Sequence, residues 1–184
     1  MAVRAFDGRT RKGSPIPYVT HLFAVAALVG EYGGDEDQIV AGLLHDYLED
    51  IPGSRRSDLS GPFGERVAEI VEDLTDATTF PKPPWRARKE AHLRHVAQMG
   101  PSARLVGAAD KFHNITTLVR DVRRYGPSTI ERFSGGRAGT VWYYRAMADA
   151  LGQGWDGPLL DEVRTQADAL EGLLAETVSS PSAK

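Results

Sequence analysis

Apolar residues recur every three or four positions through most of this chain, and no segment shows the alternation of a half-buried strand. This spacing places the apolar side chains of each segment on one face of a helix. The pattern predicts long helices over residues 18–32, 36–50, 63–77, 85–99, 103–126, 140–151 and 159–178. With shorter pieces bounded by Pro127 and Gly135, we expect an all-α globule of about eight or more helices.

The length of the chain bounds its domain organisation. At 184 residues it is long enough for one well-buried core and too short for two. A glycine-rich stretch, "GQGWDGP", follows the helix expected to end at Leu151. We therefore expect one domain over residues 1–152. Residues 153–184 are expected to form a C-terminal helix packed on that domain and a short disordered tail.

Charge and cysteine content exclude several functional classes. The formal net charge of −3 and the pI of about 6.0 argue against a broad surface for DNA, RNA or anionic lipid. Without cysteine, a disulfide framework, a thiolate nucleophile and a thiolate metal site are excluded. The longest apolar stretch, "HLFAVAALVG", is about half a membrane span, and the N-terminus does not resemble a signal peptide. We expect a cytoplasmic protein with small-molecule partners and no membrane association.

The stretch "LLHDYLED", residues 43–50, concentrates charge where a helix would normally bury apolar side chains. On a helix, His45 and Glu49 lie on one face one turn apart, and so do Asp46 and Asp50. Carboxylates near a helix C-terminus are disfavoured by the helix dipole and repel one another. A divalent cation would compensate for this clustering. A solvated acidic helix end is the alternative, because a single His-Asp pair arises easily by chance.

Two further residues favour a metal site. His21 lies on the preceding helix, although a lone histidine on a helix is more often a packed or surface residue. Asp110 lies in the most apolar part of the helix expected over 103–126. A buried aspartate costs on the order of several kcal/mol unless it is paired or coordinated. Because the chain has no cysteine, any protein ligand to a metal must be His, Asp or Glu.

This order of a His, a His-Asp pair and a distant Asp resembles the ligand set of the HD superfamily of metal-dependent phosphohydrolases. "TRKGSPIPYVTH" resembles the Arg-Lys, Gly, Pro-Tyr and His signature that opens the hydrolase domain of RelA/SpoT alarmone enzymes. "AGLLHDYLED" resembles their Leu-Leu-His-Asp-x-x-Glu-Asp motif. "FGERVAEIVEDLTD" and "LVGAADKFHNITTL" are similar to two further motifs of that domain, in the same order. The resemblance covers residues 11 to about 145.

The resemblance implies a fold, an activity and a set of site residues. It implies an HD-domain helical globule that removes the 3′ diphosphate of (p)ppGpp, giving GDP or GTP and pyrophosphate. The metal ligands that it implies are His21, His45, Asp46 and Asp110. Mn²⁺ is the cofactor that it favours, and a mixed imidazole and carboxylate set suits this ion. Glu49 and Asp50 match the catalytic acidic pair, which would orient and deprotonate a water molecule.

The same resemblance implies residues that bind the nucleotide. Arg11 and Lys12 match a pair that contacts it, the arginine through its planar guanidinium. Without the motif, a solvated basic segment would be the better interpretation of this pair. Asn114 matches a residue near the ribose, the alternative being a local hydrogen bond. Lys89 and Arg137 fall where related enzymes place basic residues that bind phosphate.

The remaining histidines are not expected to bind metal. By helical geometry, His113 faces away from Asp110, and we expect a structural role or support of a ligand. His92 and His95 lie on a polar helix, so we expect both at the surface.

Three functions remain open at this stage. The first is a (p)ppGpp 3′-pyrophosphohydrolase, which the Glu-Asp and Arg-Lys pairs favour. The second is another HD-domain nucleotide phosphohydrolase, such as an NADPH 2′-phosphatase or a ppApp hydrolase. The third is a non-catalytic nucleotide-binding or antitoxin module, against which the intact acidic residues argue. A nucleotide is the expected small-molecule partner, and the final helix leaves a homodimer open.

Overall fold

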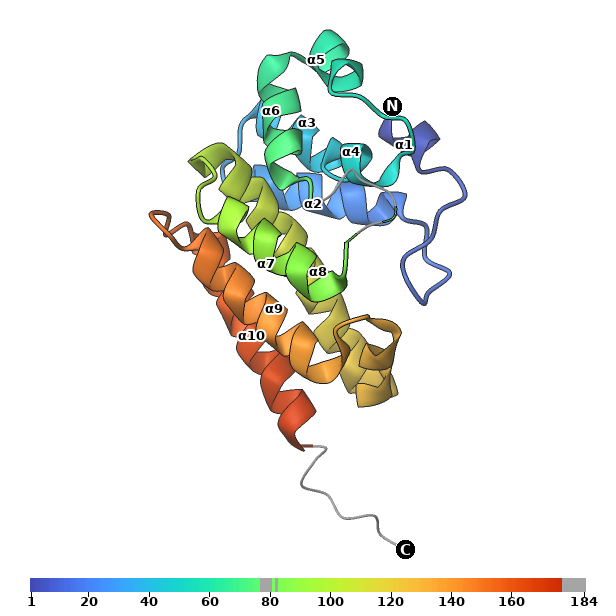
Figure 1. The fold of residues 1–184 in the computed structure, drawn as a ribbon, viewed down its shortest axis with the longest axis vertical. Coiled ribbons are helices and arrows are strands. Elements are labelled where there is room, and N and C mark those ends of the chain that lie inside the picture. Colours follow the sequence, from blue (N-terminus) through green and yellow to red (C-terminus); the bar gives the residue numbers. More distant parts are fainter. Residues whose placement is uncertain (77–80, 82, 177–184) are drawn as a thin grey trace, which may run out of the picture.

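The structure, a computed structural model, describes residues 1–76, 81 and 83–176. These residues form ten α-helices and one 3₁₀ helix, with no β-strand besides one isolated bridge, so the all-α prediction is confirmed (Figure 1). In chain order the helices are α1 (Ala2–Ala5), α2 (Val19–Glu31), α3 (Glu36–Leu44), α4 (Tyr47–Asp50), α5 (Ser57–Phe63), α6 (Glu65–Leu74), α7 (Trp85–Val96), α8 (Pro101–Tyr125), η1 (Pro127–Arg132), α9 (Gly136–Leu151) and α10 (Pro158–Glu176). The expected C-terminal tail and the last residues of two expected helices lie outside the described residues.

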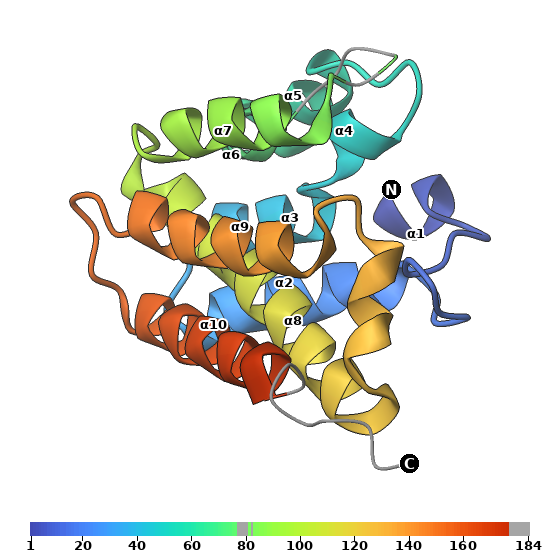
Figure 2. The same ribbon diagram turned by 60° about the horizontal axis from the view of Figure 1, so that its bottom comes forward.

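Helix α8 is the central element. It packs against α2, α3, α6, α9 and α10, and Figures 1 and 2 show α9 and α10 side by side along it. The N-terminal half of α8 lies in an apolar cluster with α2, α3, α6 and α9. Its C-terminal half lies in a second cluster with η1 and α10. One helix of 25 residues, roughly 37 Å long, therefore connects the two parts of the core.

The segment expected to form one helix over residues 36–50 forms two. Helix α3 ends at Leu44 and α4 begins at Tyr47, and between them Asp46 adopts φ −93° and ψ 2°. Consecutive side chains on a straight helix point about 100° apart. The break instead allows His45 and Asp46 to face the same point, as described below. The prediction of an unbroken helix was wrong because apolar periodicity carries no information about this requirement.

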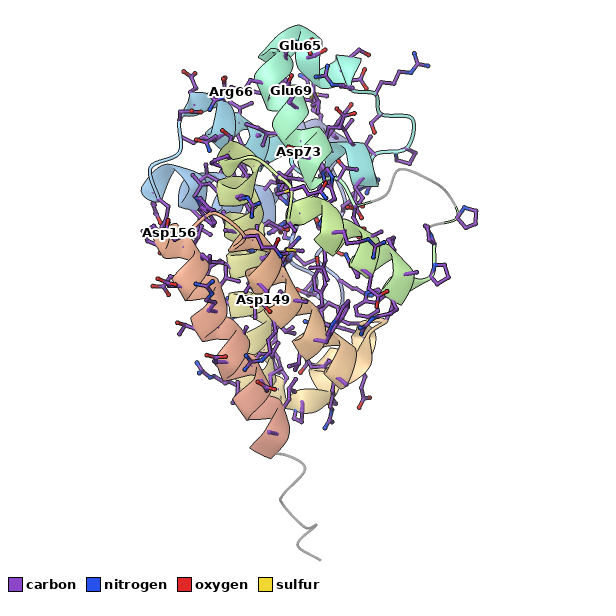
Figure 3. All side chains as sticks on the ribbon, turned by 60° about the vertical axis from the view of Figure 1, so that its left-hand side comes forward. Glu65, Arg66, Glu69, Asp73, Asp149 and Asp156 are labelled. Atoms are coloured by element: carbon purple, nitrogen blue, oxygen red, sulfur yellow. The ribbon has the colours of Figure 1, made fainter. Side chains whose placement is uncertain are left out.

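Helix α6 is amphipathic. Phe63, expected at its start, closes α5 instead, because Gly64 turns the chain with a φ of 90° that favours glycine. The inner face of α6 buries Val67, Ala68, Ile70 and Val71. Figure 3 shows Glu65, Glu69 and Asp73 along the outer side of the helix, where the two glutamates are exposed and Asp73 is half-buried. This outer face is solvated and lies apart from the site described below.

The C-terminal helix α10 packs along α8 and α9. Its buried residues are Leu159, Leu160, Val163, Ala167, Leu170 and Leu174. The last three complete the second apolar cluster. Within the described part of the chain, no helix has both the length and the apolar character needed to cross a bilayer.

Arg104, on α8, is buried against the C-terminal ends of two other helices. Its side chain donates to the carbonyl groups of Ala97 and Met99, which follow α7, and of Ala150 and Leu151, at the end of α9. Carbonyl groups at a helix C-terminus lack partners within the helix. The guanidinium therefore caps α7 and α9 together and ties both to α8.

We expect Arg104→Met to lower the free energy of unfolding by about 3–5 kcal/mol, because four carbonyl groups lose their charged donor. Urea denaturation followed by circular dichroism measures the change. The exposed Arg94 provides a control, and Arg94→Met should change stability by less than about 0.5 kcal/mol. A loss below about 1 kcal/mol for Arg104→Met would mean that water replaces the guanidinium without penalty.

Candidate metal centre and adjoining cleft

Four side chains from three parts of the fold meet at one point. His21 lies on α2, His45 and Asp46 form the junction between α3 and α4, and Asp110 lies on α8. The Nε2 atom of His21 is 3.1 Å from Asp110 Oδ1 and 3.7 Å from Asp46 Oδ2. The Nε2 atom of His45 is 2.9 Å from Asp46 Oδ2 and 3.6 Å from Asp110 Oδ1. Ligand atoms bound at about 2 Å to one ion lie roughly 3–4 Å apart, so this spacing suits a shared cation.

Hydrogen bonds orient both imidazoles with Nε2 toward this centre. His45 Nδ1 lies 2.8 Å from the Gly42 carbonyl oxygen, which only accepts, so Nδ1 carries the proton. His21 Nδ1 lies 2.8 Å from His113 Nδ1. Burial lowers the pKa of His21, and burial with the charges of His21 and Arg11 lowers the pKa of His113 to about 4. The lowered pKa values favour neutral rings, so one Nδ1 donates to the other, and when His21 is the donor its Nε2 keeps a lone pair for a cation.

The chemistry of this cluster fits a divalent cation. His45 Nε2 is buried and makes no hydrogen bond to any described residue. Burial disfavours a charge on His45, but Asp46 and Asp110 raise its pKa well above the usual value. Burial also disfavours ionisation of Asp46, but His45 lowers the pKa of this carboxyl to about 2. Ligand atoms of His21, His45 and Asp46 all lie within 4.8 Å of one another, and Asp110 approaches both imidazoles, so this mixed imidazole and carboxylate cluster suits a divalent cation.

Neighbouring side chains hold the two carboxylates in place. The hydroxyl of Tyr18 donates to Asp46 Oδ2 at 2.6 Å. Asp110 accepts from Lys111 through Oδ2 and from Asn114 through Oδ1. Burial disfavours ionisation of Asp110, but the charge of Lys111 holds its pKa well below the ordinary range. These contacts fix the direction in which each carboxylate faces the centre.

We expect Tyr18→Phe to weaken metal binding by about 10- to 100-fold, because Asp46 loses the hydrogen bond that orients it. Titration of the metal-free protein with Mn²⁺ measures the affinity. Tyr32→Phe is the matched control, since Tyr32 packs against the core away from the centre. An unchanged affinity in Tyr18→Phe would show that Asp46 needs no orienting donor.

Glu49 and Asp50 lie on α4, directly after the His-Asp junction. Glu49 Oε2 accepts the backbone N–H of Asp76 at 3.3 Å, and Glu49 Oε1 lies 4.0 Å from Arg88 Nη1. Burial raises the pKa of Tyr18, and the charge of Asp50 acts in the same direction, so Asp50 also lies near the centre. The structure thus brings both acidic residues beside the metal cluster.

A small cavity of about 40 Å³ lies between this centre and α7. Lys89 lines it, with its ammonium group 2.7 Å from Asp76 Oδ2. His92 lines it too and is buried, and burial together with the charge of Lys111 lowers its pKa to about 3. The expected surface position was therefore wrong for His92, because α7 turns this part of its polar face inward. His95 is half exposed, as expected.

A cleft of about 980 Å³ adjoins the metal centre. Tyr18, His113 and Asn114 line the cleft and also bind members of the metal cluster. Arg11 lines the same wall, and its Nη2 donates to Asn114 Oδ1 at 2.8 Å. Lys12 lines the cleft as well. Three of the residues that the sequence indicated for nucleotide binding are therefore in one cleft, next to the metal centre.

Arg137 lies apart from both cavities, with its guanidinium 4.0 Å from Glu131. The cleft also contains residues that the sequence had not indicated, among them Thr117, Asp121, Arg132 and Phe133. The helical spacing of Thr117 and Asp121 from Asp110 was visible in the sequence and could have indicated them. Arg132 and Phe133 lie at the end of η1, and they reach the cleft because η1 packs against α8 and α9. The sequence contains no pattern that predicts this packing.

The chain matches the family described as "HD domain" over residues 1–134. It is 35% identical over 121 residues to the guanosine-3′,5′-bis(diphosphate) 3′-pyrophosphohydrolase MESH1 of Xenopus tropicalis, covering 65% of this chain and 63% of that protein. It is 35% identical over 120 residues to the bifunctional (p)ppGpp synthase/hydrolase SpoT of Escherichia coli K12, covering 62% of this chain and 16% of SpoT. The chain thus spans less than two thirds of the length of either relative.

Two solved structures share the fold. A protein of Listeria monocytogenes superposes with a TM-score of 0.75 at 26% identity, covering 83% of this chain and 99% of that one. A metazoan SpoT ortholog superposes with a TM-score of 0.74 at 24% identity, covering 90% of this chain and 88% of that one. The family match extends over well more than half of the chain and includes all four side chains of the metal cluster. This protein therefore belongs to the HD domain family.

Proposed function

We propose that this protein is a metal-dependent (p)ppGpp 3′-pyrophosphohydrolase, which converts (p)ppGpp and water into GDP or GTP and pyrophosphate. One observation carries the proposal: a nucleotide-sized cleft lined by Arg11 and Asn114 opens beside the buried cluster of His and Asp, with Glu49 on the adjoining helix. The 35% identity to a pyrophosphohydrolase and to SpoT supports the same reaction class.

The metal cluster would hold one divalent cation through His21, His45, Asp46 and Asp110. We propose Mn²⁺, because two imidazoles and two carboxylates suit this ion and leave positions for water and phosphate oxygens. When bound, such a cation supplies Lewis-acid activation of water and of a phosphate group.

Glu49 is the proposed general base. It would accept a proton from the water that attacks the phosphorus bonded to the ribose 3′ oxygen. The bond between phosphorus and this oxygen breaks, and pyrophosphate leaves with the oxygen of water. The 3′ oxygen takes up the proton that water gave to Glu49, so the ribose keeps a 3′-hydroxyl. The backbone N–H of Asp76 holds Glu49 for this role, and Asp50, next on α4, would orient the same water.

Arg11 and Asn114 would bind the nucleoside. The guanidinium of Arg11 donates to Asn114 and, at 3.3 Å, to Thr117, which fixes its plane for stacking on a base. Asn114 also binds Asp110, so the ribose site is tied directly to the metal centre. Lys89, beside the metal centre, remains our candidate for a phosphate contact. Arg137 lies outside the cleft and would contact only a part of the substrate that projects beyond it.

The direct test is product analysis. The purified protein is incubated with Mn²⁺ and, separately, with ppGpp, ppApp and NADPH, and the phosphorus products are identified. Pyrophosphate and GDP from ppGpp support the proposal. Orthophosphate, from NADPH for example, would indicate a different nucleotide phosphohydrolase on the same metal centre. Nucleotide binding without turnover of any substrate would indicate a non-catalytic module.

A further inference from the structure

One polar stripe on α8 leads from the metal centre into the cleft. Asp110, Asn114, Thr117 and Asp121 follow one another at steps of four, three and four residues, so they share one face of the helix. Asp121 lies within about 20° of Asp110 around the helix axis and about 16 Å further along it. The two residues between them both bind Arg11. The stripe therefore passes the proposed nucleoside site and ends at Asp121, which lines the cleft.

Asp121 is the one carboxylate among the described residues that line this cleft. The other charged lining residues are basic, namely Arg11, Lys12, Arg120, Arg124 and Arg132. Asp121 Oδ2 accepts from Arg132 Nη2 at 2.8 Å, whereas Oδ1 is 3.9 Å from Arg120 Nε, too far for a hydrogen bond. Oδ2 is thus engaged by one neighbour and keeps a second lone pair, and Oδ1 is available to a donor in the cleft.

Arg132 is itself held in position by its neighbours. Its guanidinium carbon lies 5.1 Å from the centroid of the Phe133 ring. Its side chain also packs on Gly13, where an added Cβ would come within 2.7 Å of Arg132 Cδ. Gly13 therefore leaves the space that Arg132 occupies. The ion pair between Arg132 and Asp121 is a constrained part of the cleft wall rather than a mobile surface contact.

We infer that Asp121 recognises the Watson–Crick edge of a purine base and makes the cleft selective for guanine over adenine. This inference rests on the proposed function. With the 3′ diphosphate at the metal centre and the ribose at Asn114, the base lies near Thr117. Asp121 follows Asn114 by about 10 Å along α8, a distance comparable with the length of a purine nucleoside.

The chemistry of the two bases gives the selectivity. Guanine presents two donors on this edge, the N1–H and the N2 amino group, and a carboxylate is an acceptor through both oxygens. Adenine presents an unprotonated N1 beside its N6 amino group. The lone pair of N1 would face the carboxylate, and two acceptors in contact repel each other. Arg11, fixed by Asn114 and Thr117, can stack on either base and does not discriminate between them.

The competing assignment is that the basic residues of the cleft bind the 5′ diphosphate and Asp121 only balances their charge. The two assignments differ in one measurable respect. If Asp121 only balances charge, its neutralisation strengthens binding of guanine and adenine nucleotides equally. If it recognises guanine, its neutralisation changes the ratio of the two affinities.

The experiment is Asp121→Asn, with guanosine and adenosine 3′,5′-bisphosphates titrated into the Mn²⁺-loaded protein by calorimetry. Asparagine offers one acceptor and one donor, which complements adenine. We expect the guanine-to-adenine affinity ratio to fall at least about tenfold, through weaker guanine binding and stronger adenine binding. Asp121→Ala should lose the preference for guanine without gaining affinity for the adenosine bisphosphate. An unchanged ratio, or an equal gain for both bases, overturns the inference.

Asp168→Asn is the matched control. Asp168 accepts from Arg145 Nη2 at 2.8 Å, as Asp121 does from Arg132, but on the exposed face of α10 outside the cleft. It should leave both affinities unchanged.

The outcomes separate this inference from the proposed function. Because bisphosphate binding needs no pyrophosphate release, a guanine preference without pyrophosphate release would overturn the proposed function alone. Pyrophosphate release with equal affinity for both bases would overturn this inference alone, and failure to bind either bisphosphate would overturn both.

Discussion

Replacement of Glu49 by glutamine should lower kcat for pyrophosphate release by a factor of about 10²–10⁴, the usual contribution of a general base. Glutamine keeps the size of the side chain and can still accept the N–H of Asp76, which reaches Glu49 Oε2 at 3.3 Å. It cannot take a proton from water. KM and metal content should stay close to wild type, and steady-state kinetics with metal analysis of the same preparations measure all three quantities.

Glu69→Gln removes a carboxylate of the same kind from the outer face of α6, where Figure 3 shows Glu69 exposed on the surface. This control should retain full turnover. A Glu49→Gln enzyme with kcat within tenfold of wild type would exclude Glu49 as the base and favour another residue for proton transfer. Loss of metal from that variant would instead show that Glu49 is itself a ligand.

His45→Gln should abolish stoichiometric metal binding and, with it, turnover. His45 Nε2 is a buried atom that lacks a hydrogen-bond partner within the described residues, and it faces both carboxylates of the cluster. Glutamine cannot place a nitrogen lone pair there. Elemental analysis of the purified variant should find little or no tightly bound divalent metal, whereas wild type should hold about one ion.

Thermal unfolding provides an independent readout for the same variant. A cation at 100 times its Kd stabilises wild type by about 2.7 kcal/mol, so chelation should lower its Tm. The Tm of His45→Gln should not respond to Mn²⁺ or to chelator. His95→Gln, which changes a half-exposed histidine on α7, should behave as wild type in both experiments. Metal retention in His45→Gln would remove this residue from the ligand set.

The fold class was predictable because helical spacing of apolar residues persists in every long segment. The expected helix over residues 103–126 agrees closely with α8, Pro101–Tyr125. Errors arose where a tertiary requirement or one glycine overrides the local pattern. The chain breaks at His45 and Asp46, where both side chains face one point, and again at Gly64, which adopts a positive φ. Periodicity reports which face is apolar and does not report a break of one or two residues.

The site was predictable to the extent that ligand-type residues stand out from an apolar background. Asp110 on a buried helical stripe is such a residue, and the structure brings it within 3.1 Å of His21. Of the residues that orient the cluster, Tyr18 carried no comparable signal, whereas support of a ligand was one of the two roles expected for His113. The contacts of Tyr18 with Asp46 and of His113 with His21 depend on how α2 crosses α8 and on the junction after α3. Such contacts join residues that are 28 and 92 positions apart in the chain.

The division of α8 between two apolar clusters gives the two ends of the cleft separate supports. The end beside the His and Asp cluster rests on α2, α3, α6 and the start of α10, whereas the end that contains Asp121 rests on η1 and the second half of α10. Substitutions at Ala167, Leu170 or Leu174 of α10 can therefore reshape the proposed nucleobase pocket without disturbing the proposed chemistry at the other end. In a family with this architecture, substrate preference can diverge during evolution while the hydrolytic machinery stays the same.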